Sequence, residues 1–384
     1  MAQVTTRSSW ADDDLELFRD SLRRHIVDEL APHAEEWRAQ KMVSREAWKS
    51  LGAMGALCPS VPEAYGGVGG SFAYEAMVIE ELERGVSEMS VGFSVHSAIV
   101  AHYIVEYGSE EQKKRWLPGM VSGEIIGAIA MTEPGAGSDV QSIRTSALKQ
   151  GNVYKLNGQK TFITNGQLAG VILVAAKTDP KQGAKGISLF LVDAKSAGYR
   201  PGRNLDKIGL AASDTSELFF DDVELPPDTL LGPEEGKGFA QMMQQLPQER
   251  LALAIGGIAA MERAIEITIE YCKDRQAFGK SILEFQNTNF KLAELLTECR
   301  VGRAFVDDCI SKHAAGTLDG ATASMAKMWI SQKQNEVVDA CLQLHGGYGY
   351  MREYEIARRF VDARIQKIYG GTNEIMKLLI ARTL

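Results

Sequence analysis

The spacing of hydrophobic residues changes twice along this chain of 384 residues, and each change predicts a different kind of secondary structure. From residue 10 to about 124, apolar residues recur three and four apart, which is the pattern of helices that bury one face. Between about 125 and 237 the apolar runs become short and β-rich, and turn signals separate them. Helical spacing then returns in long segments, at 250–274, 282–313, 318–342 and 352–365.

This order of helices, strands and helices predicts an α+β protein of several domains. We expect an N-terminal helical domain at 1–124, a central antiparallel β domain at 125–237 and a C-terminal helical bundle at 238–384. The length agrees, because 384 residues exceed what a single hydrophobic core usually holds. A doubly wound nucleotide-binding fold is disfavoured, since it requires strands that alternate with helices.

The composition is that of an ordinary globular protein and disfavours several kinds of partner. A net charge of −8 gives no reason to expect nucleic acid or an anionic membrane surface. The longest apolar run, 251–261, is well short of the ~18 residues of a membrane span. The five cysteines form no CxxC pair, so neither a disulfide framework nor a metal site is expected. The first residues resemble neither a secretory signal nor a transit peptide, so we expect a cytoplasmic protein.

Two glycine-rich stretches call for interpretation. The first, TEPGAGSD at 132–139, lacks the GxGxxG spacing of a dinucleotide-binding loop, and loop and strand rather than a helix should follow it. Taken alone, it predicts only a turn. The second, IYGGTNEI at 368–375, can lie close to a ligand because glycine has no Cβ, but it carries no obvious base.

Five stretches occur together in the order and at the separations seen in acyl-CoA dehydrogenases. They are AMTEPGAGSD (130–139), KTFITNG (160–166), DRQAFGKSILEFQ (274–286), QLHGGYGYM (343–351) and IYGGTNEI (368–375). The resemblance covers nearly the whole chain and is closest to the long-chain branch, which is similar in LPQERL, RAFVDDC and VDARIQKIYGGTNEIM. It implies a helical domain, a β-barrel domain and a four-helix-bundle domain, assembled as a homotetramer with one FAD per subunit.

The activity implied by the resemblance is the FAD-dependent α,β-dehydrogenation of an acyl-CoA thioester to a trans-2-enoyl-CoA. A base removes the α-proton, flavin N5 accepts the β-hydride, and an electron-transfer flavoprotein receives the electrons. Two alternatives stay open: an acyl-CoA oxidase that uses O₂, and a non-catalytic family member that binds acyl-CoA or assists assembly. The sequence does not identify the acyl chain.

The resemblance implies that the base is Glu249. Many relatives carry the catalytic glutamate where this chain has Gly370, but the long-chain and isovaleryl branches take it from a helix position that corresponds to Glu249. Pro247 is expected to end or kink that helix, and the apolar run after Arg250 should raise the pKa of Glu249 toward neutrality. The alternative is a solvated glutamate paired with Arg250.

Gly370 is expected to act through its backbone. Its N–H can donate to the thioester carbonyl, and the missing side chain should leave room for a relocated carboxylate. The residues implied for substrate binding are Ser138, Pro247, Gln248, Arg250, Tyr369, Gly370 and Gly371.

The resemblance also implies the contacts with FAD. Met131 and Thr132 are expected to face the flavin pyrimidine. Phe162 is expected to pack on the isoalloxazine, with the Thr164 hydroxyl near N5. The full set of implied cofactor-binding residues is Ile129, Ala130, Met131, Thr132, Gly137, Ser138, Phe162, Ile163, Thr164, Arg275, Phe278, Gln286, Gln343, Leu344, His345, Gly346, Gly347, Thr372 and Glu374.

Part of this set is expected to reach the FAD of a neighbouring subunit. That part consists of Arg275, Gln286 and the backbone of 343–347, and an arginine suits the charge of the two phosphates. Without the resemblance, we would interpret His345 as a structural histidine and both Phe162 and Tyr369 as core aromatic residues.

Overall fold

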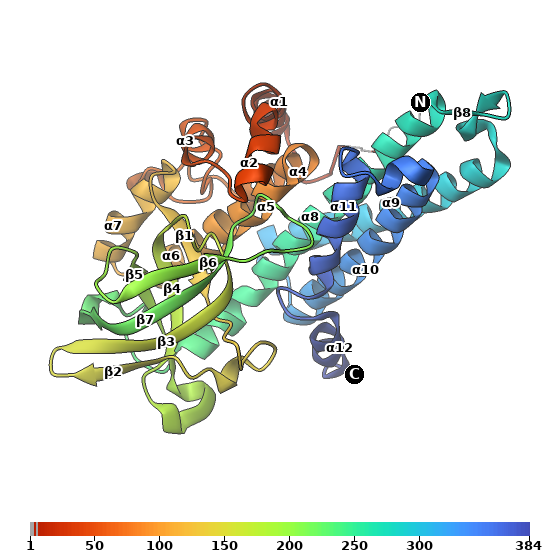
Figure 1. Cartoon of the computed structure of the whole chain (residues 1–384). Coiled ribbons are helices and arrows are strands. Elements are labelled where there is room, and N and C mark those ends of the chain that lie inside the picture. The colour runs from red at the N-terminus through yellow and green to blue at the C-terminus, as the bar shows by residue number, and fades with distance from the viewer. Residues whose placement is uncertain (1–3, 5–6) are drawn as a thin grey trace.

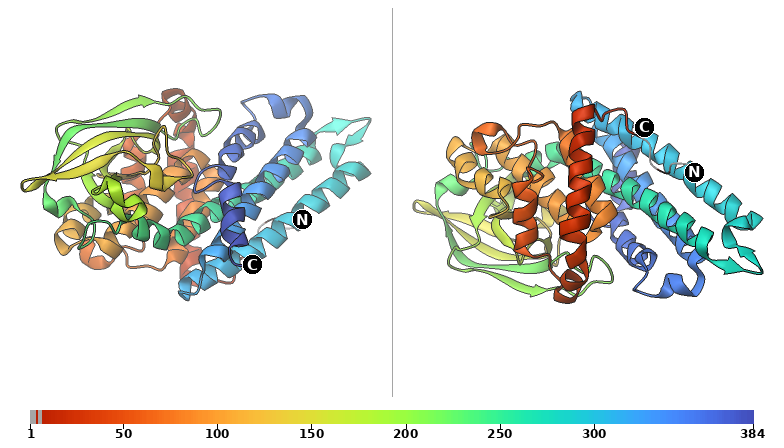
Figure 2. Two further views of the ribbon diagram at one scale, coloured as in Figure 1. Left: turned by 90° about the horizontal axis from the view of Figure 1, so that it is seen from below. Right: turned by 90° about the horizontal axis from the view of Figure 1, so that it is seen from above.

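The computed structural model describes residue 4 and residues 7–384, which form an N-terminal set of helices, a β-sheet and a C-terminal bundle of helices (Figure 1). This mixed fold confirms the class predicted from the changes in hydrophobic spacing. Figure 2 shows the sheet at one end of the molecule and the C-terminal bundle at the other. Among the described residues, none of the helices combines the length and the apolar character that crossing a membrane requires.

A long helical run lies among the N-terminal helices, just before the last of them. Residues 87–107 form one helical run whose middle part, at Ser94–Ala101, is a π-helix, a form that is frequent at functional sites. The helices are α1 (Asp13–His25), η1 (Ile26–Leu30), η2 (Ala31–His33), α2 (Ala34–Gln40), α3 (Arg45–Ala53), η3 (Glu63–Tyr65), α4 (Phe72–Gly85), α5 (Ser87–Phe93), η4 (Ser94–Ala101), α6 (His102–Tyr107) and α7 (Glu110–Val121).

The strands form one seven-stranded sheet in the order β1-β4-β2-β3-β7-β6, with β5 paired to β4. Most pairs are antiparallel, but β4 pairs parallel with β1 and, through one residue pair, with β2, which departs from the predicted antiparallel arrangement. The chain makes the β2–β3 hairpin between β1 and β4, and such a long connection can return it in the same direction. The strands are β1 (Ile126–Ala130), β2 (Ser146–Gln150), β3 (Val153–Thr164), β4 (Ala169–Lys177), β5 (Ile187–Asp193), β6 (Tyr199–Asn204) and β7 (Thr215–Leu225).

The C-terminal bundle is built around α8, which spans Gly238–Asp274. Of the two expectations for Pro247, that it ends the helix is wrong, because α8 begins nine residues earlier and continues through the proline, and a kink there stays a prediction. Packing on both sides outweighs the one backbone hydrogen bond that proline removes. The other elements are β8 (Gln276–Ala277), β9 (Lys280–Ser281), η8 (Ile282–Glu284), α9 (Gln286–Ala314), α10 (Gly320–His345), η9 (Gly346–Tyr350), α11 (Glu355–Ala363), η10 (Arg364–Lys367) and α12 (Asn373–Ala381).

Helix α8 connects the parts of the molecule (Figure 1). At its start, a Cβ on Gly238 would lie 2.8 Å from the carbonyl carbon of Ser188 in β5. Farther along, a Cβ on Gly257 would lie 2.6 Å from the Ile330 side chain in α10, so the glycine permits close packing of the two helices. Every residue from Gln248 to Glu262 except Leu253 is buried.

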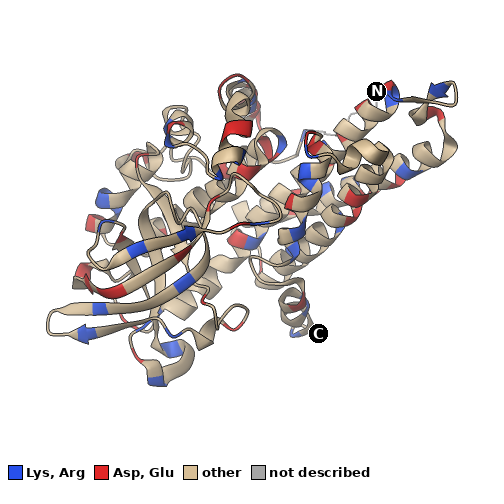
Figure 3. Cartoon of the chain, in the orientation of Figure 1, with Lys and Arg blue, Asp and Glu red and all other residues tan. Residues whose placement is uncertain are grey.

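Buried ion pairs join α8 to the N-terminal helices and to α9. Acidic and basic residues are interspersed along these helices (Figure 3). The Arg303 guanidinium of α9 makes two hydrogen bonds of 2.9 Å to the Glu262 carboxylate of α8 and also contacts Glu80 of α4. All three side chains are buried, so each charge depends on the others for its stabilisation.

Replacing Arg303 with alanine should lower the free energy of unfolding by about 3–5 kcal/mol, because Glu262 and Glu80 would stay buried without their cation. Denaturant unfolding followed by circular dichroism measures the loss. Arg263→Ala is the control: Arg263 pairs with Glu355, both are about a third exposed, and its loss should cost much less. Equal losses in the two variants would contradict the role given to the buried pair.

Candidate active site

Glu249 lies in the first half of α8 and is buried. Only 8% of its surface is exposed, and the hydroxyl of Tyr103 in α6 donates a hydrogen bond of 3.0 Å to its Oε1. Burial raises the pKa of Glu249 to about 7, although this hydrogen bond and the Arg250 charge oppose the increase. The alternative of a solvated glutamate does not hold, because both Glu249 and Arg250 are buried and the guanidinium donates to Oγ of Ser324 over 3.2 Å.

The side chain of Gln248, next to this glutamate, is used inside the fold. Its Nε2 donates to the carbonyl of Ala98 over 2.6 Å, and its Oε1 lies 2.9 Å from Nε2 of His313. Gln248 therefore ties α8 to η4 and α9, and only its backbone is available to a substrate.

Gly370, the first glycine of the pair in the last loop, lies against the turn of α8 that follows Glu249. Gly370 and Gly371 have φ values of +63° and +93°, which residues with a side chain rarely adopt. A Cβ on Gly370 would lie 2.3 Å from Cδ1 of Leu253, and Leu253 is one helical turn beyond Glu249. A side chain at position 370 would therefore require the end of the Leu253 side chain to move, so the room expected there depends on Leu253. The contact also places the loop backbone beside the helix face that carries the buried glutamate.

A buried lysine holds this loop from α10. Nζ of Lys327 donates to the carbonyl of Gly371 over 2.7 Å and to Oδ1 of Asn373 over 3.1 Å. Burial lowers the pKa of Lys327 to about 8. The hydroxyl of Thr372 caps α12 by accepting from the N–H of Ile375. Sequence reasoning missed Lys327, because lysines are rarely buried and nothing near it in the chain marks it as an exception.

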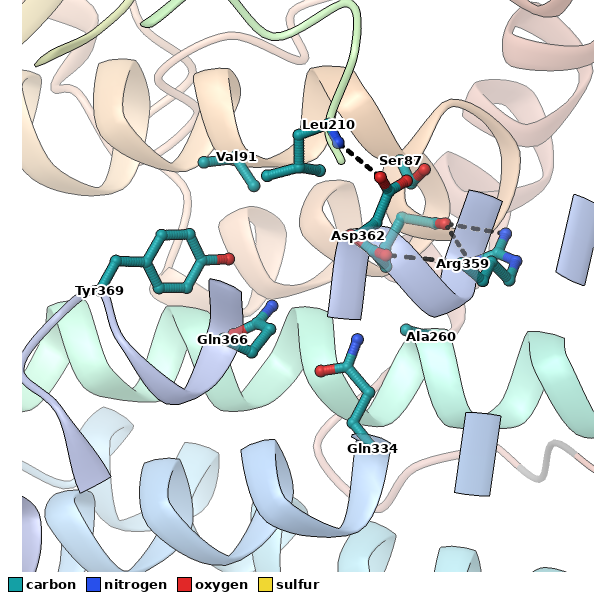
Figure 4. Close-up of a pocket in the computed structure, with 10 residues that line it drawn as sticks. Ser87, Val91, Leu210, Ala260, Gln334, Arg359, Asp362, Gln366 and Tyr369 are labelled. Carbon is teal, nitrogen blue, oxygen red and sulfur yellow. Dashed lines mark hydrogen bonds and ion pairs between the residues drawn. The ribbon is translucent and has the colours of Figure 1, made fainter. Parts of the chain in front are cut away.

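Tyr369 extends from the same loop into a small polar pocket, together with Glu83, Arg359 and Asp362 (Figure 4). Burial raises the pKa of Asp362 to about 7 and that of Glu83 to about 8. The N–H of Leu210, in the connection between β6 and β7, donates to Oδ1 of Asp362 over 2.5 Å. The pocket therefore joins α4, α11 and the β domain behind the last loop. The sequence did not reveal it, because its members lie far apart along the chain.

Phe162 on β3 is exposed and has an unusual backbone conformation. Its φ is +60°, and 67% of its surface is exposed, so the alternative of a core aromatic residue is wrong. The pairing of β3 with β7 shifts register between Lys160 and Ile163, and such an irregularity redirects side chains. A non-glycine residue at positive φ is a form of strain that occurs often at functional sites.

A buried ion pair aligns the backbone beside this phenylalanine. Nζ of Lys160 lies 2.9 Å from Oε1 of Glu133 and donates to the carbonyl of Met131 over the same distance. The N–H of Thr161 donates to the carbonyl of Thr132 over 2.9 Å. The segments 131–133 and 160–162 therefore lie side by side, as a shared contact with one ligand requires. Sequence reasoning did not identify the pair.

The remaining residues assigned to this region differ in exposure. The side chains of Ala130 and Ile163 are buried, so only their backbones can contact a ligand. Ile129 and Thr164 are partly buried, whereas Gly137 and Ser138 are exposed in the turn that the sequence predicts.

A pocket of about 560 Å³ brings Arg275, at the end of α8, together with the segment 344–347. The Arg275 guanidinium lies 5.4 Å from the ring centre of Tyr348. A Cβ on Gly346 or Gly347 would meet no atom within 4 Å, so the pocket wall is open there. The ring of His345 is buried, with Nδ1 3.0 Å from the carbonyl of Cys341, and so has a structural contact.

Within one chain, the predicted cofactor residues around Phe162 lie far from those around Arg275. These are the two groups of predicted cofactor residues. The β8–β9 hairpin lies at the end of the bundle far from the sheet that carries Phe162 (Figure 1). Phe278, between β8 and β9, is 97% exposed and has a φ of +53°. Gln286, Gln343 and Glu374 are also exposed.

Comparison with known proteins relates this arrangement to a family. Three family models match consecutive parts of the chain: the N-terminal, middle and C-terminal domains of acyl-CoA dehydrogenase, at 12–124, 128–223 and 236–384. The long-chain specific acyl-CoA dehydrogenase of Sus scrofa is 52% identical over 371 residues, which are 96% of this chain and 86% of that protein. That relative is mitochondrial, so the cytoplasmic location expected here stays a prediction.

Solved structures give the same result. An acyl-CoA dehydrogenase from Geobacillus kaustophilus is 49% identical, with a TM-score of 0.96 over 98% of this chain and 99% of that chain. A glutaryl-CoA dehydrogenase from Mycobacterium smegmatis, in complex with FADH₂, is 31% identical, with a TM-score of 0.91 over 97% and 95% of the two chains. These matches confirm the resemblance seen in the motifs, and the chain belongs to the acyl-CoA dehydrogenase family of enzymes, which dehydrogenate acyl-CoA.

Proposed function

We propose that Glu249 takes the α-proton of an acyl-CoA thioester, which the enzyme converts to the trans-2-enoyl-CoA. The observation that supports this role is a buried glutamate with a pKa near 7 on the helix face that the last loop covers. A base with a pKa near the ambient pH is ionised often enough to react and still binds a proton firmly. Glu249 therefore suits proton abstraction near neutral pH.

The last loop would act on the thioester carbonyl. We propose that the N–H of Gly370 donates to the carbonyl oxygen, where negative charge develops as the α-proton leaves. Lys327 would keep this N–H in place through its bond to the carbonyl of Gly371. The apolar residues of α8 that follow Glu249 would exclude water from the carboxylate. Among the other substrate contacts proposed are Ser138, Pro247 and Arg250. Tyr369 would contribute only its backbone, because its side chain lies in a separate pocket.

The proposed cofactor is FAD, and the residues present fit it. Phe162 offers an exposed aromatic face, and the Cβ-free positions Gly346 and Gly347 leave space next to Arg275, whose charge suits phosphate. When bound, FAD would supply the acceptor for the β-hydride. Because the two groups lie at opposite ends of one chain, we propose a homotetramer in which a neighbour completes each site. The FADH₂ complex of the Mycobacterium smegmatis relative supports this choice of cofactor.

The proposed electron acceptor is an electron-transfer flavoprotein. Anaerobic addition of acyl-CoA should bleach the flavin, and the bleached enzyme should then reoxidise slowly in air. Rapid reoxidation with formation of peroxide would favour the oxidase alternative, and a lack of bleaching by any acyl-CoA would favour a non-catalytic role. A panel of straight, branched and aryl-substituted acyl-CoAs in the same assay identifies the substrate class.

Glu249→Gln should retain FAD and bind acyl-CoA but reduce the flavin on the order of 10²–10⁴-fold more slowly, because an amide cannot accept the α-proton. In the unmodified enzyme the rate should fall as the pH drops below about 7, where the carboxylate becomes protonated. Stopped-flow flavin absorbance measures both effects. Glu270→Gln, an exposed change on the same helix, is the control and should react normally. Unchanged kinetics of Glu249→Gln would exclude Glu249 as the base.

Arg275→Ala should weaken FAD retention and tetramer assembly together, because one guanidinium serves a cofactor that two subunits share. Gel filtration with detection of flavin absorbance measures both. Lys280→Ala removes an exposed cation from the neighbouring strand β9 and is the matched control. A tetramer of Arg275→Ala with full FAD content would rule out the proposed contact.

A carboxylate at position 370 should replace the missing base better when Leu253 is also shortened. Glu249→Ala should be nearly inactive, and the further change Gly370→Glu should restore little activity, because its Cβ would overlap Leu253. Adding Leu253→Ala should restore measurable flavin reduction, although the positive φ of Gly370 will still cost about 1–2 kcal/mol. The double variant Glu249→Ala with Leu253→Ala is the control. If the triple variant reacts no faster than this control while binding FAD and acyl-CoA, the two positions cannot reach the same proton.

A further inference from the structure

We infer that Tyr103 is a positioning residue for the proposed base: its hydroxyl holds one carboxylate oxygen of Glu249 and leaves the other oxygen for the substrate. The inference rests on the proposed function of Glu249 and adds a residue of the N-terminal domain to that site.

The contact is a buried hydrogen bond between two domains. Tyr103 has none of its surface exposed, and its hydroxyl lies 3.0 Å from Oε1 of Glu249. Burial raises the pKa of Tyr103 well above its ordinary value, so the phenol keeps its proton and acts as the donor. A hydrogen bond from a neutral donor to a carboxylate stabilises the ionised form of that carboxylate.

The position of Tyr103 is fixed by its surroundings. It lies in α6, at the end of the helical run that contains the π-helix η4. Its ring packs edge-on against Tyr107, with 6.0 Å between the ring centres. The hydroxyl of Tyr107 is bonded to Gln244 and Gln245 at 3.0 and 2.6 Å. Burial and the ring contact with Tyr107 therefore hold Tyr103 in place, and neither depends on the Tyr107 hydroxyl.

The two oxygens of the carboxylate differ as a result. Oε1 accepts from Tyr103, and among the described residues no hydrogen bond reaches Oε2. A carboxylate that is held at one oxygen has less freedom to rotate, so Oε2 keeps one direction. This division leaves Oε2 to accept the proton.

The other charged groups around this site have contacts elsewhere. Arg250, on α8 itself, acts on Glu249 through its charge and donates to α10. Lys327 of α10 is bound to the last loop, and His313 of α9 is bound to Gln248. Tyr369 of the last loop lines a separate pocket.

Tyr103 is thus the side chain from the N-terminal domain that affects the ionisation of Glu249. Its hydrogen bond lowers the pKa of Glu249, whereas burial raises it. Removing its hydroxyl should make Glu249 harder to ionise, because burial would then be opposed only by the nearby positive charge.

The variant Tyr103→Phe tests the inference, because it removes the donor and keeps the ring. In the FAD-loaded enzyme, the ascending limb of kcat/KM against pH reports the pKa of the free base and should move up by about one unit. At pH 6.5 kcat/KM should fall about tenfold, and much of the loss should disappear at pH 9. A purely structural role would lower the rate equally at all pH values.

A second measurement does not depend on activity. The infrared band of the protonated carboxyl, assigned by its absence in Glu249→Gln, gives the pKa of Glu249 directly, and Tyr103→Phe should raise that pKa by the same amount. Tyr107→Phe is the matched control: it removes a hydroxyl four residues away that bonds to glutamines rather than to Glu249, and it should change neither measurement.

The outcomes separate the two proposals. If Glu249→Gln is inactive but Tyr103→Phe shifts neither the pH profile nor the infrared band, the positioning role is wrong and the base assignment stands. If Glu249→Gln is active, the proposed base is wrong, and an infrared shift in Tyr103→Phe would then show only a structural hydrogen bond, which also overturns the positioning role. Equal shifts in Tyr103→Phe and Tyr107→Phe would overturn it as well.

Discussion

Helix α8 has to be covered on nearly every side, and much of the structure follows from this requirement. An amphipathic helix needs one apolar contact surface, but here every residue from Gln248 to Glu262 except Leu253 is buried. Helices from both ends of the chain supply the cover, and Gly257 lets α10 come close. Leu253 is partly buried, and Gly370 of the last loop passes over it. Glu249 is buried in the same part of α8.

Glu249 is buried and Glu355 is half-buried, and their pKa values differ because their hydrogen-bond donors differ. Burial acts to raise the pKa of Glu355, but Arg359 and Arg263 outweigh it and lower that pKa to about 2. Glu249 has a phenol donor from Tyr103 in place of bonds to arginine, and its pKa is about 7. Glu355, bonded to two arginines, is therefore too weak a base near neutral pH, whereas Glu249, held by a neutral donor, can still take a proton.

The domain order could be predicted because hydrophobic spacing reports local structure directly. Pro247 misled the prediction, because a local rule about proline was outweighed by packing that the sequence does not show. Glu249 was found through resemblance to a family, since the apolar run after it is visible in the sequence but its burial is not. Tyr103 and Lys327 were missed for one reason: each gains its role from a contact across the fold, and neither stands out among its sequence neighbours.

The contact between Gly370 and Leu253 shows why a single position cannot describe this site. Glycine at 370 adopts a φ of +63° without strain, and it lets the side chain of Leu253 occupy the place of a Cβ. A chain with a carboxylate at 370 needs a smaller residue or another rotamer at 253, and it also loses the conformational freedom of glycine. A chain with its base at 249 has no such need and can fill the space with leucine. The packing at 253 and the residue at 370 are therefore coupled, because a side chain at 370 would require Leu253 to change.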